Sequence, residues 1–301
     1  MSRRNFLIKT VLTGAALSLP TGLDTLARAV AGTPPPASLV MATGPSAAAV
    51  TRAAIGGLGG ISRFIAKGDV VVIKPNMSWD RVPEQAGNTN PEVVATVVAL
   101  CLEAGAKSVT LFDRPVNDPR RCYVQSGIGP AAEKAGGRVE FMNDRRFKKM
   151  AIGGMVLKEW PIYRDVVEAD KLINIPIAKH HSRARLSMSM KNWMGVLGGD
   201  RSTLHQRLDE CLVDLAGFIR PTLTVLDAVR VLVANGPQGG DLADVKRLDT
   251  VIAGIDQVAI DALGATLFGL QGSDLGYVRL GHQRGLGNMR LDPLHIIKLS
   301  V

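Results

Sequence analysis

The stretch AKHHSRARLSMSMKNWMGVLGG, residues 178–199, concentrates positive charge without a single carboxylate to balance it. Its basic residues are Lys179, His180, His181, Arg183, Arg185 and Lys191. Uncompensated positive charge in a cleft raises the local concentration of anions and holds them by charge-assisted hydrogen bonds. The segment therefore predicts an anion-binding wall. The alternative is a solvated basic face, or a set of ion-pair partners for Asp and Glu elsewhere in the chain.

A second cationic position stands at the end of the apolar run VVVIKPN, where Lys74 and Asn76 flank Pro75. Proline fixes its backbone φ and removes an N–H, which stiffens the turn. A lysine with an amide two residues further on suits a phosphate or carboxylate, whereas the alternative is a strand-ending lysine that reaches solvent. We expect Lys191 and Asn192 to come to the same edge of the fold.

The glycine-rich stretch NGPQGG at 235–240 could let backbone N–H groups approach an anion. It matches neither GxxxxGK[ST] nor GxGxxG, so a plain turn is the alternative. The expected ligand-binding residues are Asn76, Lys179, Asn192, Gly236 and Gly239.

Catalysis would fall mainly to lysines, because the sequence contains neither GxSxG nor HExxH. Lys74, Lys179 or Lys191 could stabilise a developing oxyanion, or one crowded lysine with a depressed pKa could act as a base. Asp227, near the end of the apolar run TLTVLDAV, is a candidate acid/base partner. The expected catalytic residues are Lys74, Lys191 and Asp227.

A divalent metal is a further hypothesis, with His181 and His205 as ligands and Asp227 able to join them. Adjacent histidines in an extended chain point to opposite faces, so we favour His181 over its neighbour. The three cysteines are Cys101, Cys122 and Cys211. They form no CxxC pair, so the chain has no intrinsic iron–sulfur motif and its cofactor is left open.

These residues need a scaffold, and the apolar patterns predict strands that alternate with helices. Strands are expected at 38–44, 68–76, 108–113, 171–178, 222–229 and 249–255, and helices at 46–65, 91–105, 204–219 and 256–269. This order predicts an α/β fold with a mostly parallel sheet and helices on both faces, a Rossmann-like three-layer architecture. In such a sheet a ligand usually sits outside the carboxyl ends of the strands. Lys74 to Asn76, Asp113 to Pro115, Lys179 to His181 and Asp227 are expected near those ends.

The first 31 residues resemble a bacterial twin-arginine export signal, with Arg3-Arg4, a Phe-Leu pair, a modest apolar region and Ala29-x-Ala31. A Pro/Ser linker at 32–38 and a single domain at 39–301 follow. We therefore expect export by the twin-arginine translocation machinery to the periplasm or another extracytoplasmic space. The alternative is an uncleaved signal that anchors the chain, which is the only membrane contact expected.

The chain has 301 residues, of which 46% are hydrophobic, and a formal net charge of +9. That composition is globular. Aromatic residues make up only 4% and do not alternate with the basic ones, as a surface that stacks bases would require. Nucleic acid is therefore not an expected partner.

Several motifs in order resemble the DUF362 family, a domain of unknown function, over about 39–270. They are VVVIKPNMS, NTNPEVVATVVALCLEAGAKSVTLFDRP, ADKLINIPIAKHHSRARLSMSMKNWMGVLGG with a downstream His205, TLTVLDAV, GPQGG and VAIDALGATLFG. The resemblance implies that some relatives are iron–sulfur proteins with ferredoxin-like Cys clusters, which this chain lacks. The leading hypothesis is an exported enzyme acting on an anionic small molecule, a carboxylate or phosphate, with or without the help of a metal. The alternatives are a non-catalytic periplasmic protein that binds a ligand or metal, and a redox protein with an externally supplied metal or iron–sulfur cofactor.

Overall fold

The computed structural model describes residues 38–301. The expected export signal at 1–31 and the linker at 32–38, apart from Ser38, lie outside the described residues. Among residues 38–301, no helix combines the length and the apolar character needed to cross a membrane.

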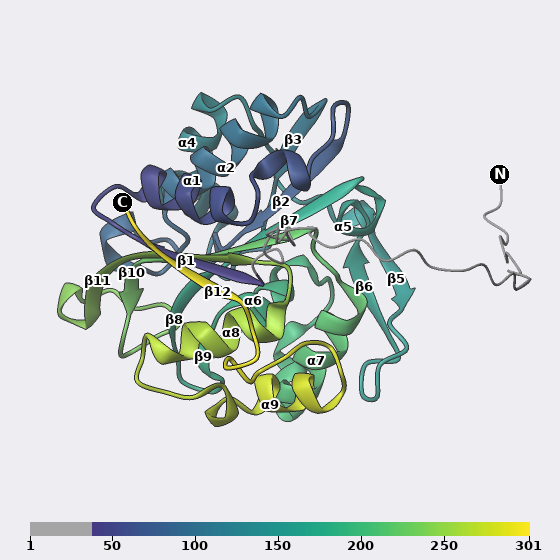
Figure 1. Cartoon of the computed structure of the whole chain (residues 1–301). Helices are drawn as coiled ribbons and strands as arrows, with labels where there is room; N and C mark the ends of the chain where they lie inside the picture. The colour runs from purple at the N-terminus through teal and green to yellow at the C-terminus, as the bar shows by residue number, and fades with distance from the viewer. Residues whose placement is uncertain (1–37) are drawn as a thin grey trace, which may run out of the picture. The chain divides into compact units, whose positions relative to one another are not determined.

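A ten-stranded sheet runs through the centre of this part of the chain (Figure 1). Its main order is β12-β1-β11-β10-β7-β2-β3-β4, with β8 paired to β10 and β9 paired to β8. Six of its pairings within residues 38–301 are parallel and three are antiparallel, which confirms the expected mostly parallel sheet. Its strands are β1 Leu39–Thr43, β2 Val70–Pro75, β3 Ser108–Leu111, β4 Arg138–Val139, β7 Lys171–Ile175, β8 Ile177–His181, β9 Arg185–Ser187, β10 Leu223–Leu232, β11 Val245–Gly254 and β12 Ile296–Ser300.

Helices cover both faces of the sheet, as the sequence predicted (Figure 1). One buried apolar cluster joins the sheet to α1 Ala47–Gly57, α2 Pro91–Glu103, α3 Pro119–Gln125 and α4 Ile128–Lys134. The other joins it to α5 Asp165–Glu168, α6 Ser189–Asn192, α7 Leu208–Phe218, α8 Gln257–Thr266 and α9 Gly276–Gln283. The result is the three-layer α/β architecture.

The residues next to the helix termini explain where α2 begins and where α1 begins and ends. Asn90 caps α2 by accepting the N–H of Glu92 at 2.8 Å, and Pro91 takes the first helical position, where its missing N–H costs nothing. Ser46 caps α1 by accepting the N–H of Ala49, but the predicted helix at 46–65 was too long. α1 ends at Gly57, because Gly59 and Gly60 adopt φ values of 101° and 85°, which a right-handed helix excludes.

The single strand predicted at 171–178 is two strands, β7 and β8, separated by Pro176. Proline has no N–H to give to a sheet ladder, so the pairing changes at this residue. β7 pairs with β2 and β10, whereas β8 pairs with β10 and β9. Lys179 and His181 therefore lie within a strand and not in the loop after one.

A two-stranded hairpin, β5 Phe147–Ala151 and β6 Glu159–Tyr163, was not predicted. Its charged, largely exposed first strand FKKMA lacks a clear apolar alternation. Asp214 of α7 holds the loop of this hairpin by accepting the backbone N–H groups of Met155, Val156 and Leu157 at 2.7–3.0 Å.

Candidate functional site: a cationic cavity

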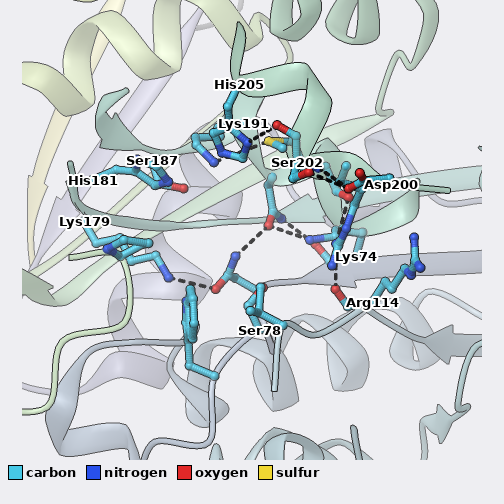
Figure 2. A pocket seen from close by; sticks show the side chains of 18 of the residues that line it. Lys74, Ser78, Arg114, Lys179, His181, Ser187, Lys191, Asp200, Ser202 and His205 are labelled. Carbon is cyan, nitrogen blue, oxygen red and sulfur yellow. Dashed lines mark hydrogen bonds between the residues drawn. The ribbon is translucent and has the colours of Figure 1, made fainter. Parts of the chain in front are cut away.

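A cavity of about 490 Å³ opens where β2, β3 and β8 end and α6 begins (Figure 2). Five Lys and Arg side chains line it, against one carboxylate, that of Asp200. The cationic five are Lys74, Arg114, Lys179, Lys191 and Arg201. Of the residues expected from sequence, the structure brings together Lys74, Asn76, Lys179, His181, Lys191, Asn192 and His205.

Lys74 is fully buried and forms an ion pair with Asp113, with 3.0 Å between Nζ and Oδ1. The Asp113 carboxylate also accepts the backbone N–H groups of Met77 at 2.7 Å and Arg114 at 2.9 Å. Burial lowers the pKa of Lys74, and the charge of Asp113 opposes that shift. The pair therefore ties the ends of β2 and β3 together. Lys74 is consequently less free to act on a ligand than its position in the sequence suggested.

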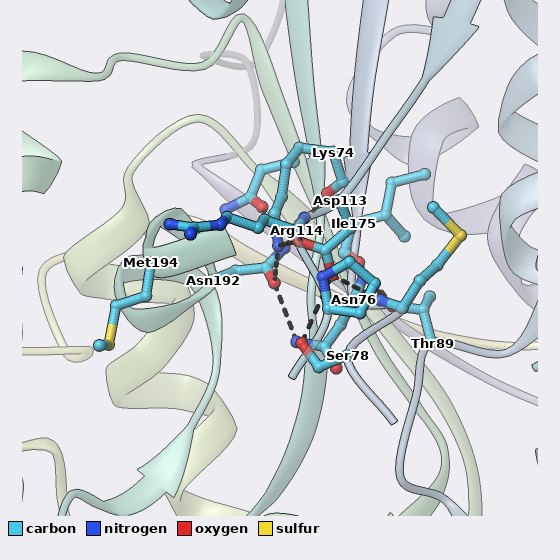
Figure 3. Close-up of polar contacts among 12 residues, drawn as sticks. Lys74, Asn76, Ser78, Thr89, Asp113, Arg114, Ile175, Asn192 and Met194 are labelled. Atoms are coloured by element: carbon cyan, nitrogen blue, oxygen red, sulfur yellow. Dashed lines mark hydrogen bonds and ion pairs between the residues drawn. The ribbon is translucent and has the colours of Figure 1, made fainter. Parts of the chain in front are cut away.

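The amides of Asn192 and Asn76 connect Lys74 to Lys179. Figure 3 shows Lys74 with both amides. Asn192 Oδ1 accepts from Lys74 Nζ at 2.6 Å and from Asn76 Nδ2 at 3.1 Å. Asn76 Oδ1 then accepts from Lys179 Nζ at 3.1 Å. Asn192 Nδ2 donates to Asn174 Oδ1 at 2.8 Å, so a third amide, which was not predicted, fixes the orientation of this chain. Amides hold the lysines in place without neutralising their charge.

Lys179 has two hydrogen-bond acceptors but no carboxylate. Its Nζ donates to Asn76 Oδ1 and, at 2.5 Å, to the carbonyl of Gly87. Burial lowers the pKa of Lys179 well below its ordinary value, and the nearby charge of Lys191 lowers it further. The side chain is 1% exposed, which makes its charged form costly.

Lys191 is the least constrained of the three lysines. Its Nζ contacts the Met194 sulfur at 3.4 Å, and among residues 38–301 no carboxylate oxygen lies within 4 Å of it. Burial lowers its pKa to about 7, with the charges of Arg201 and Lys74 acting in the same direction. This amine therefore exchanges its proton near neutral pH.

Asp261 of α8 holds the start of α6, the short helix that carries Lys191. Its carboxylate accepts the backbone N–H groups of Ser189 at 2.7 Å and Met190 at 3.0 Å, which are the first two of α6. A fully buried carboxylate at this point satisfies two donors that the short helix leaves unpaired. Burial raises its pKa to about 8.

Asp261→Ala is expected to lower the free energy of unfolding by about 3 kcal/mol, because two buried N–H groups lose their acceptor. Urea denaturation measures the change. Asp292→Ala, at an exposed carboxylate, is the control and should leave stability nearly unchanged. Equal effects of the two substitutions would contradict the anchoring role of Asp261.

His181 and His205 stack with 6.4 Å between ring centroids. His181 Nδ1 accepts the backbone N–H groups of Arg183 at 3.1 Å and Ala184 at 3.2 Å, so the proton of the neutral ring is on Nε2. Burial and the charges of Lys191 and Lys179 lower its pKa to about 3. Within the described residues, no group of three or more His, Cys, Asp or Glu could hold a metal ion. The structure thus gives the predicted metal site no third ligand.

Three expected site residues do not line the cavity. Asp227 is fully buried in β10, where it accepts the backbone N–H groups of Asn90 at 2.7 Å and Val229 at 2.9 Å. Burial raises its pKa to about 6. In this position Asp227 lies apart from the other expected catalytic residues and anchors the start of α2.

Gly236 and Gly239 also lie outside the lining, although Pro237 between them reaches the cavity. The N–H of Gly236 is used by His180 Nδ1 at 3.0 Å, and so cannot bind an anion. The adjacent histidines thus have different partners, since His181 Nδ1 accepts from Arg183 and Ala184.

The sequence placed Arg114 near the carboxyl end of a strand but gave a specific role neither to it nor to Arg201. In the structure Arg114 follows the end of β3 at Leu111 and lines the cavity. Arg201 gave no such signal, because it begins a 3₁₀ helix, Arg201–Arg207, that only the tertiary structure brings to the cavity. Its guanidinium donates to the carbonyls of Arg114 at 2.9 Å and Met194 at 3.1 Å.

The fold and site define a three-layer α/β protein with a cationic cavity at the carboxyl edge of its parallel strands. Comparison with known proteins agrees with the resemblance of the motifs: the model of the family described as Domain of unknown function (DUF362) matches residues 71–266. The chain belongs to the DUF362 family.

One similar protein is the thylakoid-associated protein sll1697 of Synechocystis sp., which is 32% identical over an alignment of 227 residues, with 67% of each chain covered. A crystal structure of a Thermotoga maritima protein aligns with 78% of this chain at 11% identity and a TM-score of 0.39. The alignment spans 59% of that protein's chain.

Proposed function

We propose that the chain binds a small carboxylate or phosphate in the cationic cavity and acts on it as an enzyme. One observation carries this: five cationic side chains face the cavity, and only Lys74 has a carboxylate partner among the described residues. Burying unpaired charge is costly, so an anionic ligand would complete the site. The cavity volume is in the range of small-molecule sites.

The hydrogen-bond partners of each cavity side chain indicate its role in the proposed function. Lys74, Asn76 and Asn192 bond mainly to one another and would position the site. Lys191 is available as a base or as a cation beside a developing oxyanion, since its pKa is about 7. His181 would donate a hydrogen bond through Nε2, and Arg201 retains N–H groups beyond those given to carbonyls.

The same cavity would also suit a non-catalytic protein that carries an anion, and turnover of a bound compound separates the two functions. The redox alternative has less support. None of the three cysteines lines the cavity, and burial raises the pKa of Cys101 to about 12 and those of Cys122 and Cys211 to about 11. Thiolates, the form that binds a metal, are disfavoured at all three.

We further propose export through the twin-arginine machinery, on the strength of residues 1–31. Replacing Arg3 and Arg4 together by Lys should keep the protein in the cytoplasm. Cell fractionation measures this. We also expect cleavage after Ala31, which an exported protein whose N-terminal sequence begins at Ser2 would contradict.

Anion binding is tested by thermal unfolding with inorganic phosphate or citrate. A ligand present at 100 times its Kd stabilises the folded state by about 2.7 kcal/mol, so the parent should melt at a higher temperature. Lys191→Met should reduce this shift, whereas Lys134→Met, at an exposed lysine of α4, should not. Because Lys191 must carry its proton to attract an anion, the shift should fall as the pH rises through 7. Equal shifts in both variants would contradict the proposal.

A further inference from the structure

The three lysines of the cavity differ in what they can still do. Lys74 Nζ is held by Asp113 and Asn192, and Lys179 Nζ by Asn76 and the Gly87 carbonyl. Among residues 38–301, the one hydrogen-bond partner of Lys191 Nζ is the thioether of Met194, which is a weak acceptor. Of these three amines, only that of Lys191 can approach a ligand without breaking strong hydrogen bonds.

Lys191 is also surrounded by other basic side chains of the cavity. It lines the same cavity as Lys179 and His181 of β8 and His205 of the 3₁₀ helix Arg201–Arg207, and its charge lowers the pKa of all three. Figure 2 shows these side chains around the cavity together with Lys74. An amine that lies among cations loses its proton readily and then becomes a nucleophile.

The surroundings also favour one class of substrate. A ligand in contact with Lys191 would have its negative charge balanced by neighbouring cations, among them Arg114 and Arg201. His181 would present the N–H of a neutral ring to an uncharged oxygen. Such an environment suits a compound that combines an anionic group with an electrophilic carbonyl.

We propose that Lys191 forms an imine with the carbonyl group of a substrate that also carries a carboxylate or a phosphate. This inference rests on the proposed anion site and identifies its substrate class. The neutral Nζ attacks the carbonyl carbon and forms a C–N bond. The carbonyl oxygen then leaves as water with the two protons that Nζ gives up, and a C=N bond results. No oxidant or reductant takes part.

The experiment uses matched pairs of compounds. Pyruvate and lactate share a carboxylate, and dihydroxyacetone phosphate and glycerol 3-phosphate share a phosphate, but only the first of each pair has a carbonyl. Each is incubated with the full chain and sodium cyanoborohydride, which traps an imine as a stable amine. Intact-protein mass spectrometry and peptide mapping detect the adduct, and thermal unfolding detects binding.

We expect one adduct on Lys191 with pyruvate, with dihydroxyacetone phosphate, or with both, and none with either alcohol. Lys191→Arg should retain a thermal shift, because it keeps a cation, but should lose the adduct. Lys134→Arg should be labelled as the parent is. The carbonyl compound that labels the chain shows whether the anionic group of the substrate is a carboxylate or a phosphate.

The experiment distinguishes a failure of the imine proposal from a failure of the proposed anion site. If a compound stabilises the parent and neither carbonyl compound labels it, the imine is refuted and the anion site stands. Labelling of Lys191→Arg at the parent's level would refute the role of Lys191. If none of the four compounds shifts the unfolding temperature or labels the protein, the proposed function fails and the imine fails with it.

Discussion

Asp113→Asn is expected to lower the free energy of unfolding by about 3–5 kcal/mol, because it leaves the ammonium of Lys74 buried without a counter-charge. Both side chains are fully buried, so water cannot take the place of the lost carboxylate. The amide keeps the shape of the side chain, which isolates the effect of the charge. Chemical denaturation at pH 7 measures the difference.

A surface ion pair provides the matched control. Arg52 and Glu103 lie 2.9 Å apart with side chains about half exposed, and Glu103→Gln should cost less than about 1 kcal/mol. Adding Lys74→Met to Asp113→Asn should restore part of the lost stability, since the uncompensated charge is then gone. An Asp113→Asn variant as stable as Glu103→Gln would contradict the structural role of this pair.

Lys191→Met is expected to raise the free energy of unfolding at pH 6 by about 2–4 kcal/mol, whereas Asp113→Asn lowers it. The pKa of Lys191 falls from its ordinary 10.5 to about 7 in the folded chain, which corresponds to at most about 5 kcal/mol of unfavourable burial. Methionine removes the charge and fits beside Met194. Denaturation in a buffer without phosphate or carboxylates measures the change.

The pH dependence follows from the direction of the shift. Between about pH 7 and 10.5 the unfolded chain holds a proton on Lys191 and the folded chain does not. Stability of the parent should therefore rise with pH across this window, and the advantage of Lys191→Met should shrink. Below pH 7 both states hold the proton and the full penalty applies. Lys134→Met should show no such trend, and a Lys191→Met variant less stable than the parent at pH 6 would contradict the explanation.

Together these two predictions separate the cations by function. Lys74 has a buried carboxylate partner, so breaking this pair is costly. Lys191 has no carboxylate partner among residues 38–301, so its charge weakens the fold unless a ligand compensates it. A residue that costs stability and faces a cavity fits a functional role better than a structural one.

The local elements could be predicted because each depends on neighbouring residues. The apolar run before Lys74 forms β2, and the Asn90-Pro91 start of α2 follows from capping and from the fixed φ of proline. Charged strands such as β5 were missed, because exposed hairpins carry no clear alternation. The division of 171–178 at Pro176 was missed because proline also occurs where a strand merely bends.

The sequence by itself determined the α/β class, the family and a set of lysines, amides and histidines that come together, because buried strands and their carboxyl ends can be recognised from local pattern. Only the tertiary structure decided what each of them does. Lys74 pairs with Asp113, whereas Lys191 has no carboxylate partner within the described residues. Asp227 and Asp261 accept backbone N–H groups and do not line the cavity. Partners, burial and pKa depend on residues distant in the chain, which one-dimensional spacing does not encode.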